Sequence, residues 1–301
     1  MKPVDFELHR PETLTEAVDL LAAHGDDGKV LAGGQSLVPL LNFRLARPGH
    51  LIDLGRIASL SALQRTEDGL SIGAMVTHAQ AGRSPAVATA APLMAAAIPF
   101  IAHEAIRARG TIGGSIAHAD PAAELPAVAR ALDAELVVLG PGGVRRIPAE
   151  DFFVANLVTA LRPDELLARV EILPAGPATG GAFDEIGRRR GDFALVGAGA
   201  QISLADDGTI RDARLCLTGV ASTPHRAAEA EAVLVGRAPT AACLKEAASV
   251  TRQTVTPTAD LHATADYRRD VAGTLLERAV QKAADRAAAT STTSDEGRRA
   301  S

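Results

Sequence analysis

Two glycine-rich stretches contain the residues best suited to bind a ligand. The first is AGGQS, residues 32–36, and the second is TIGGS, residues 111–115. A Gly-Gly pair permits positive φ and lets a ligand approach the backbone without interference from a Cβ atom. Successive N–H groups can then point into one concavity and bind an anion, and Ser36 and Ser115 can each add a hydroxyl donor. The pair therefore predicts a clamp for a diphosphate, with tight corners of the chain as the alternative.

Other patterns that could support chemistry are weaker. GAGAQI, residues 197–202, has two glycines of the dinucleotide-binding fingerprint but precedes a predicted hairpin, so we interpret it as strand. His118, Asp120 and Glu124 could ligate a metal ion, but a polar loop after a glycine turn often contains such residues, and no further cluster of His or Cys is evident. We therefore expect no metal ligands in this chain.

The composition is that of a mildly acidic protein with enough apolar residues for ordinary cores. Apolar residues make up 47% of the 301 residues, charged residues 22%, and the net charge is -5. Because there is no basic surplus, nucleic acid is not an expected partner. Cys216 and Cys243 form no CxxC pair, so neither a disulfide framework nor an iron–sulfur or zinc site built by this chain alone is expected.

The chain shows no segment typical of export or of a membrane span. The first residues are mixed and charged, without the apolar core of a signal peptide. The most apolar stretch, residues 86–102, contains Pro92 and Pro99 and is shorter than a spanning helix requires. We therefore expect a cytoplasmic protein without a transmembrane segment.

The glycine stretches lie in two predicted α/β units. For the first unit we expect a helix over 13–25, a strand in 29–33, a helix over 37–45 and a strand in 50–54. Thr13 and Glu16 match a capping box for the first of these helices. For the second unit, which begins near 58, we expect a strand in 69–75, helices over 77–83 and 86–97, a helix starting at Asp120-Pro121, and strands in 134–140 and 165–173.

The pattern changes near residue 177. PAGPATGG, residues 174–181, is typical of a linker. Residues 192–220 alternate in polarity and turn at Asp206-Asp207-Gly208, which indicates an antiparallel hairpin. Helices are expected over 225–234, 240–252 and 265–288, and the polar residues 290–301 are expected to be disordered.

Four stretches together support a resemblance to a known family. They are AGGQSLVPLLNFRLARPGHLIDL, IRARGTIGGSIAHADPAAELP, RRRGDFALVGAGA and DLHATADYRRDVAGTLLERAV. In this order the chain resembles, from about residue 1 to 285, the FAD-binding medium subunit of the molybdenum hydroxylases. Within this xanthine dehydrogenase family it is similar to the medium chain of aerobic carbon monoxide dehydrogenase.

The resemblance implies an α+β fold. Residues 1–177 would form a two-lobed FAD-binding domain of the vanillyl-alcohol oxidase (PCMH) type, with lobes of about 1–57 and 58–177. Residues 178–286 would form a C-terminal domain with a three-stranded antiparallel sheet and helices, and residues 287–301 a disordered tail.

The resemblance also implies cofactor-binding residues. The two diphosphate loops would be Ala32, Gly33, Gly34, Gln35 and Ser36, and Thr111, Ile112, Gly113, Gly114 and Ser115. Glu124 stands where the family has an acidic residue, often Asp, that contacts the cofactor. Leu167 would contact FAD through its backbone, and Phe193 would lie against the isoalloxazine or else be a core aromatic. The family often has a lysine before this last segment, where the chain reads FDEIG.

Several residues near these positions have two interpretations. Arg107 and Arg109 could aid phosphate binding or form structural salt bridges. His103 could line the cofactor channel or be an ordinary half-buried histidine. Tyr267, together with Arg268 and Arg269, is expected to anchor the last helix.

The function that the resemblance implies is electron transfer through FAD. The partners would be a large molybdopterin subunit and a small subunit with [2Fe-2S] clusters, assembled as a dimer of heterotrimers. Electrons would leave to a quinone, cytochrome, oxygen or NAD, and no residue of this chain is expected to act as a catalytic acid, base or nucleophile. The alternatives are a stand-alone FAD-dependent oxidoreductase of the same flavin-binding fold and a nucleotide-binding module without a redox role.

Overall fold

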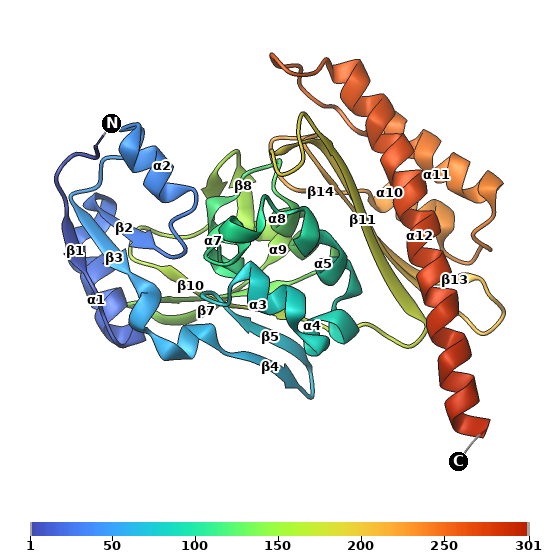
Figure 1. Cartoon of the computed structure of the whole chain (residues 1–301), viewed down its shortest axis with the longest axis horizontal. Helices are drawn as coiled ribbons and strands as arrows, with labels where there is room; N and C mark the ends of the chain where they lie inside the picture. Colours follow the sequence, from blue (N-terminus) through green and yellow to red (C-terminus); the bar gives the residue numbers. More distant parts are fainter. Residues whose placement is uncertain (1, 300–301) are drawn as a thin grey trace.

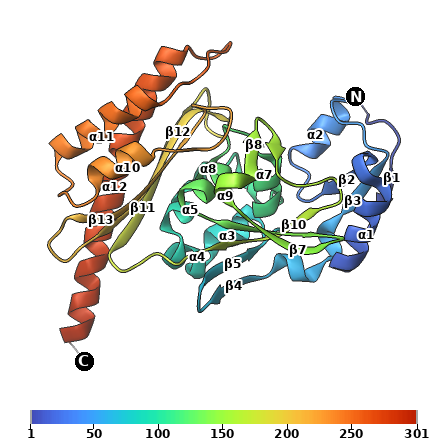
Figure 2. The same cartoon turned by 180° about the vertical axis from the view of Figure 1, so that it is seen from behind.

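The computed structural model describes residues 2–299, with side chains described as far as residue 290. The fold is α+β, as expected: three main sheets are packed with helices (Figure 1). The first lobe and the C-terminal sheet lie at opposite ends of the molecule, with the second lobe between them (Figures 1 and 2). None of the helices in the described part of the chain is long and apolar enough to cross a membrane.

The first lobe is a small parallel sheet with the strand order β1-β3-β2. Its elements are β1 (Glu7–His9), α1 (Leu14–His24), β2 (Gly28–Leu31), α2 (Leu37–Asn42) and β3 (His50–Asp53). The capping box of Thr13 and Glu16 is confirmed, and Ala17, Val18 and Leu21 of α1 are buried against the sheet. The first glycine loop lies between β2 and α2, so the strand presents it at its carboxyl end.

The second lobe is built on a five-stranded antiparallel sheet with the order β4-β5-β10-β6-β7. Its strands are β4 (Leu63–Thr66), β5 (Gly69–Gly73), β6 (Glu135–Gly140), β7 (Gly143–Pro148) and β10 (Leu166–Ile172), beside the short pair β8 (Phe153–Ala155) and β9 (Val158–Thr159). Its helices are α3 (His78–Arg83), α4 (Pro85–Ala90), α5 (Pro92–Ala97), α6 (Glu104–Arg107), α7 (Ile112–His118), α8 (Glu124–Ala131) and α9 (Ala149–Phe152). Short 3-10 helices are η1 (Gly25–Asp27), η2 (Leu54–Arg56), η3 (Ala58–Ser61) and η4 (Ile98–Phe100).

Three predictions for this lobe were wrong in detail. The helix expected over 86–97 is two helices, because Pro92 begins a new one. The glycines of the second stretch form the first turn of α7, capped by Thr111, rather than a turn before a helix. Helix α8 begins at Glu124 instead of Asp120-Pro121, because the Asp120 carboxylate accepts the N–H of Ala122 in a local turn.

The C-terminal part is an antiparallel sheet covered by three helices. The strands, in the order β11-β12-β13-β14, are β11 (Thr179–Gly187), β12 (Ala194–Leu204), β13 (Ile210–Thr218) and β14 (His225–Arg226), and the helices are α10 (Ala228–Leu234), α11 (Ala241–Thr254) and α12 (Ala265–Arg299). The hairpin and the strand interpretation of 197–202 are confirmed. The short β14 makes a fourth strand. Helix α12 continues past 287, where the sequence favours disorder, and Ala287 is fully buried.

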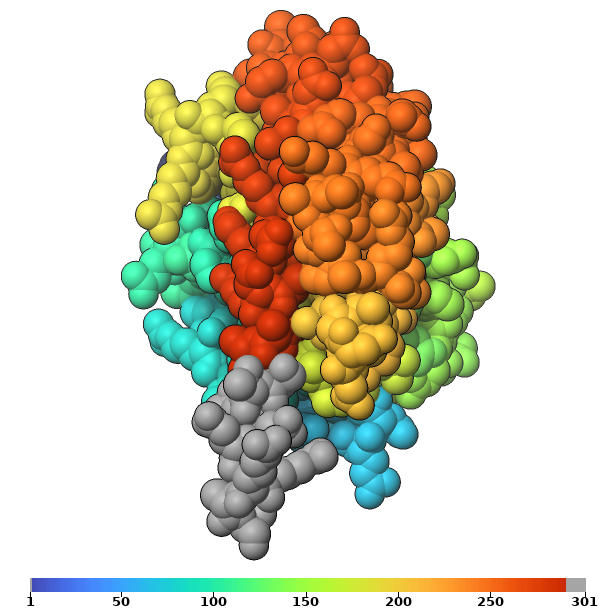
Figure 3. Space-filling view, turned by 90° about the vertical axis from the view of Figure 1, so that its right-hand side faces the viewer, coloured from blue at the N-terminus to red at the C-terminus, as the bar shows by residue number. Residues whose placement is uncertain are grey.

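Two hydrophobic cores hold these parts together. One joins the first and second lobes, and the other lies between the C-terminal sheet and α10–α12. Figure 3 shows α12 lying beside the segment of α10 and α11 on the outer face. Strand β11 connects the two cores through Gly180, which packs against the backbone of α12, and Gly181, which packs against the start of α5.

Gly181 should be essential to this junction. A Cβ at Gly181 would lie 2.6 Å from the Pro92 carbonyl oxygen, so Gly181→Ala forces the backbones apart. We expect a loss of about 2 kcal/mol in the free energy of unfolding, measured by urea denaturation. Gly142→Ala is the matched control, because its Cβ would meet nothing within 4 Å. Equal stability of the two variants would contradict this account of the junction.

Candidate FAD site

The first glycine loop presents a row of free backbone donors. Among residues 2–299, no hydrogen-bond acceptor pairs with the N–H groups of Gly33, Gly34, Gln35 or Ser36. Gly34 has a φ of +72°, a conformation that glycine adopts at little cost. The Gln35 side chain donates to the Gly33 carbonyl at 2.9 Å and so braces the loop from within. Four consecutive unpaired donors form a site suited to an anionic group such as a diphosphate.

The second glycine stretch does not present such donors, contrary to the sequence prediction. The N–H of Gly113 donates to Ala74, that of Gly114 to the Thr111 hydroxyl, and that of Ser115 to the Thr111 carbonyl. What the second stretch offers is the partly exposed Gly114, without a side chain, and the Ser115 hydroxyl, because Gly113 is buried against Ala74. The hydroxyls of Ser36 and Ser115 have no hydrogen-bond partner in the described part of the chain, so both are available to a ligand.

The fold brings the two stretches into contact. A Cβ at Gly33 would overlap the carbonyl oxygen of Arg109 and lie 2.9 Å from the Gly110 Cα. A Cβ at Gly114 would lie 3.5 Å from the Ala32 Cβ. The two lobes therefore meet at their glycine stretches, which is the arrangement that the clamp hypothesis requires.

Ile112 and Leu167 lie behind the second stretch. Ile112 is fully buried, and Leu167 is 5% exposed on β10. The carbonyl of the next residue, Ala168, accepts the N–H of Ala74, and Ala74 packs directly against Gly113. The Leu167 side chain belongs to the core, so only its backbone could face a ligand here.

An acidic pair lies between α8 and β11, with Glu124 buried and Glu185 partly buried. Burial, with a smaller contribution from the charge of Asp120, raises the pKa of Glu124 to about 7. Burial, followed by the charge of Glu124, raises the pKa of Glu185 to about 8. Within the described residues, the Glu185 Oε2 and the Thr218 Oγ1 are buried without a hydrogen-bond partner. These unpaired atoms indicate that the contact between α8 and the C-terminal sheet can accept further polar partners.

Sequence reasoning missed Glu185 as a site residue. It is the glutamate of FDEIG, where the family often has a lysine, so the departure was visible but its consequence was not. The consequence depends on Glu124, which is distant in the sequence and meets Glu185 only because α8 packs on the C-terminal sheet. Because burial raises the pKa of Glu185 to about 8, its carboxyl group is mostly uncharged at neutral pH.

Phe193 lies on the surface. It is 60% exposed in the connection between β11 and β12, so the core-aromatic interpretation was wrong. Gly191 in the same connection packs on His103. A Cβ added at Gly191 would lie 2.7 Å from the His103 Nδ1. His103 immediately precedes α6, which leads to the second glycine stretch. The side chain of Phe193 is therefore free to contact a ligand or a partner on this side of the molecule.

The arginines differ in their roles. The Arg107 guanidinium donates to the carbonyls of Ile101 and Ala102 at 2.8 and 3.0 Å, so it braces a loop, and it forms no salt bridge with a described residue. Arg109 is exposed and forms no ion pair with any described residue. Arg268 is 6% exposed and donates to Asp260 and Gly219, so it anchors α12 as expected. Tyr267 is 44% exposed, and Arg269 pairs with Asp266 of the same helix, so neither was shown to share this role.

His118, Asp120 and Glu124 do not form a group of possible metal ligands. In the described part of the chain the only such group is His9, His24 and His50, in the first lobe.

Comparison with known proteins identifies the family. Residues 4–175 match the FAD binding domain in molybdopterin dehydrogenase, and residues 181–283 match the CO dehydrogenase flavoprotein C-terminal domain. The chain belongs to the FAD-binding chains of the molybdopterin dehydrogenases.

Relatives in this family match along the whole length. The 6-hydroxypseudooxynicotine dehydrogenase complex subunit alpha of Paenarthrobacter nicotinovorans is 40% identical over 98% of this chain and 100% of that protein. The carbon monoxide dehydrogenase medium chain of Hydrogenophaga pseudoflava is 37% identical over 94% of this chain and 98% of that protein. A solved structure of the dehydrogenase from H. pseudoflava superposes with a TM-score of 0.91, covering 95% of this chain and 99% of that chain at 39% identity. The resemblance drawn from the sequence is confirmed.

The acidic pair predicts a pH dependence of stability. Because both pKa values are raised on folding, the folded chain holds protons that the unfolded chain releases. The contribution of these two carboxyl groups to the free energy of unfolding is therefore fully present below about pH 4.5 and is lost as the pH rises through about 8. Glu185→Gln should reduce the loss between about pH 5 and about pH 9 by on the order of 2 kcal/mol.

Urea unfolding of the FAD-free chain at both pH values measures this effect. The matched control is Glu67→Gln, an exposed glutamate in the turn between β4 and β5. An unchanged pH dependence in Glu185→Gln would refute the assignment.

Proposed function

We propose that this chain is the FAD-binding electron-transfer subunit of a three-subunit molybdenum hydroxylase, and hence an oxidoreductase subunit. The main support is the row of unpaired N–H groups from Gly33 to Ser36, held against the second glycine stretch. These donors occur in a chain that matches a carbon monoxide dehydrogenase medium chain over nearly its whole length.

The residues present fit FAD. The N–H groups of Gly33–Ser36 and the hydroxyls of Ser36 and Ser115 would bind the diphosphate, and Gly114 would allow close approach, while Gly113 lets the stretch pack on Ala74. We propose Ala32–Ser36, Thr111–Ser115, Glu124, the backbone of Leu167 and the exposed Phe193 as its contacts. When bound, FAD would supply the redox chemistry that connects one-electron donors to an external acceptor.

Glu124 would act as a hydrogen-bond donor to the cofactor. With a pKa of about 7, its carboxyl group is substantially protonated at neutral pH, unlike an exposed glutamate. A protonated carboxyl has one O–H donor in addition to its acceptors.

The iron–sulfur clusters and molybdopterin would reside on partner subunits. The chain has two cysteines, both buried, whereas an iron–sulfur cluster usually takes four ligands. Relatives are named as medium chains or subunits of complexes. We propose a large molybdopterin subunit and a small [2Fe-2S] subunit as partners, in a dimer of heterotrimers that passes electrons to a quinone, cytochrome, oxygen or NAD.

The domain division of the sequence analysis is part of this proposal. We assign residues 1–177 to the FAD-binding domain, with lobes of about 1–57 and 58–177, and residues 178–286 to the C-terminal domain. Its support is the pair of hydrophobic cores and the family matches on either side of this point. A cytoplasmic location stays a prediction from the sequence.

The visible absorption spectrum of the chain expressed alone tests the proposed function. After addition of FAD and desalting, we expect bands near ~370 and ~450 nm at about one flavin per chain. A folded chain that stays colourless would favour the nucleotide-binding module instead. Reduction of the bound flavin by a small organic substrate, without partner subunits, would favour a stand-alone oxidoreductase.

The two serine hydroxyls provide a test of the site itself. Ser36→Ala and Ser115→Ala should each weaken FAD binding roughly tenfold, since a hydrogen bond to a charged group contributes about 1.5 kcal/mol. Titration of the FAD-free chain, followed by flavin fluorescence, measures the affinity. Ser249→Ala, at an exposed position on α11, is the control. If both loop variants bind FAD as tightly as this control, the proposed clamp is wrong.

A further inference from the structure

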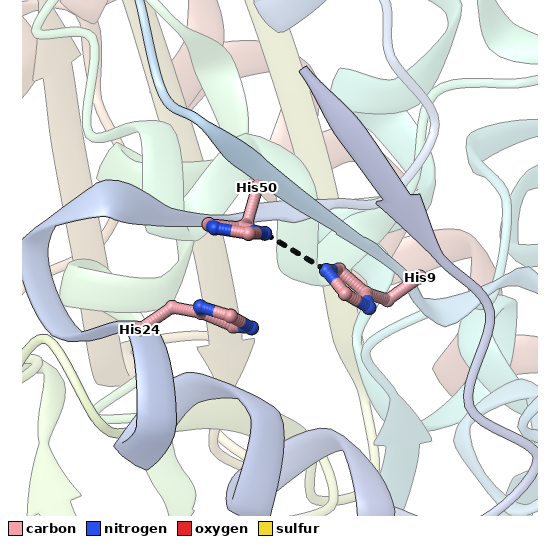
Figure 4. A group of neighbouring side chains, drawn as sticks. All are labelled: His9, His24 and His50. Carbon is pink, nitrogen blue, oxygen red and sulfur yellow. Dashed lines mark hydrogen bonds between the residues drawn. The ribbon is translucent and has the colours of Figure 1, made fainter.

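Three histidines from three elements meet at one end of the first lobe (Figure 4). His9 ends β1, His24 ends α1, and His50 begins β3. In the parallel pairing of β1 and β3, Glu7 lies opposite His50, so Glu7, His9 and His50 share one face of the sheet. Helix α1 packs on that face, as the approach of the His24 Cβ to Gly28 shows. The fold thus assembles residues that are far apart in the sequence.

The ring nitrogens are close enough to share one metal ion. One ligating atom from each of the three histidines lies within 4.8 Å of the others, and the His9 Nε2 is 3.0 Å from the His50 Nδ1. Two nitrogens bound to one tetrahedral zinc ion are about 3.3 Å apart. The His24 and His50 rings are stacked, with centroids 3.6 Å apart. One ring must rotate for both lone pairs to converge on an ion.

The surroundings favour a cation. A carboxylate oxygen of Glu7 lies 3.6 Å from the His50 Nδ1, and the other lies 3.9 Å from the His9 Nε2. Asp27, just after α1, accepts the N–H of Gly49 beside His50, and the carbonyls at the end of α1 add partial negative charge. Lys29 of β2 pairs with Leu51, one residue after His50, and so points to the opposite face. The His9 and His50 side chains are only 17% and 24% exposed, which limits competition from water.

We propose that His9, His24 and His50 bind a transition-metal ion of the zinc class, with Glu7 as the fourth ligand. Imidazole nitrogens with one carboxylate are a donor set suited to Zn²⁺. The ion would tie β1 and β3 to the end of α1. It would lie at the start of β2, whereas the first glycine loop follows the end of that strand, about 10 Å away. The site therefore stabilises the lobe that presents this loop and takes no part in redox chemistry.

Zinc titration of the untagged full-length chain tests this site. The chain is treated with EDTA, desalted and titrated with ZnCl₂ by calorimetry, and Co²⁺ is used in parallel for its visible absorption when tetrahedral. We expect about one ion per chain and a rise in Tm on zinc addition. His24→Gln should lower the zinc affinity by at least about tenfold, because it removes a ligand.

His262→Gln is the matched control, since His262 is exposed in a loop outside the cluster. It should bind zinc and gain Tm as the natural chain does. Retention of FAD by His24→Gln shows that this variant is folded. The proposal fails if the natural chain binds no zinc stoichiometrically, or if both variants bind it equally. The three histidines would then be held by their own hydrogen bond and ring stacking alone.

Discussion

The site depends on a backbone contact that only glycine allows. Gly33 lies so close to the Arg109 carbonyl and to Gly110 that no side chain fits between the two lobes at this point. This contact sets the position of the first loop relative to the second, and with it the direction of the free N–H groups from Gly33 to Ser36. A larger residue would separate the lobes by the thickness of a side chain, and the donors would no longer face the Gly114 surface.

Close backbone packing at glycines also joins the C-terminal sheet to the rest of the molecule. Gly180 and Gly181 let β11 pass between α12 and the start of α5 without intervening side chains. Because β11 is held there, Glu185 is brought under the influence of Glu124, and both carboxyls are removed from water. Removal from water is the dominant cause of their raised pKa values, so the charge state of the junction follows directly from how closely the strands and helices approach.

The features predicted correctly are those that short stretches of sequence determine. The capping box of Thr13 and Glu16, the hairpin after β12 and the position of the first glycine loop each depend on neighbouring residues. The errors arose where contacts between residues far apart in the sequence determine the local structure. Strand β11 begins inside a stretch typical of a linker, because α12 and α5 cover it. The donors of the second glycine stretch are satisfied by Ala74 and Thr111, which no local pattern indicates.

This difference between the two stretches explains how an acidic chain could hold a diphosphate. The net charge is -5, and the Arg107 guanidinium is engaged by main-chain carbonyls. Oriented peptide dipoles can supply attraction without a side-chain charge, and the first loop offers them through unpaired N–H groups whereas the second does not. The second stretch instead provides a rigid surface, fixed by its own hydrogen bonds, against which a ligand can be held. The first loop therefore supplies the main-chain donors, and the second supplies a fixed surface and the Ser115 hydroxyl, so the two similar motifs are not interchangeable.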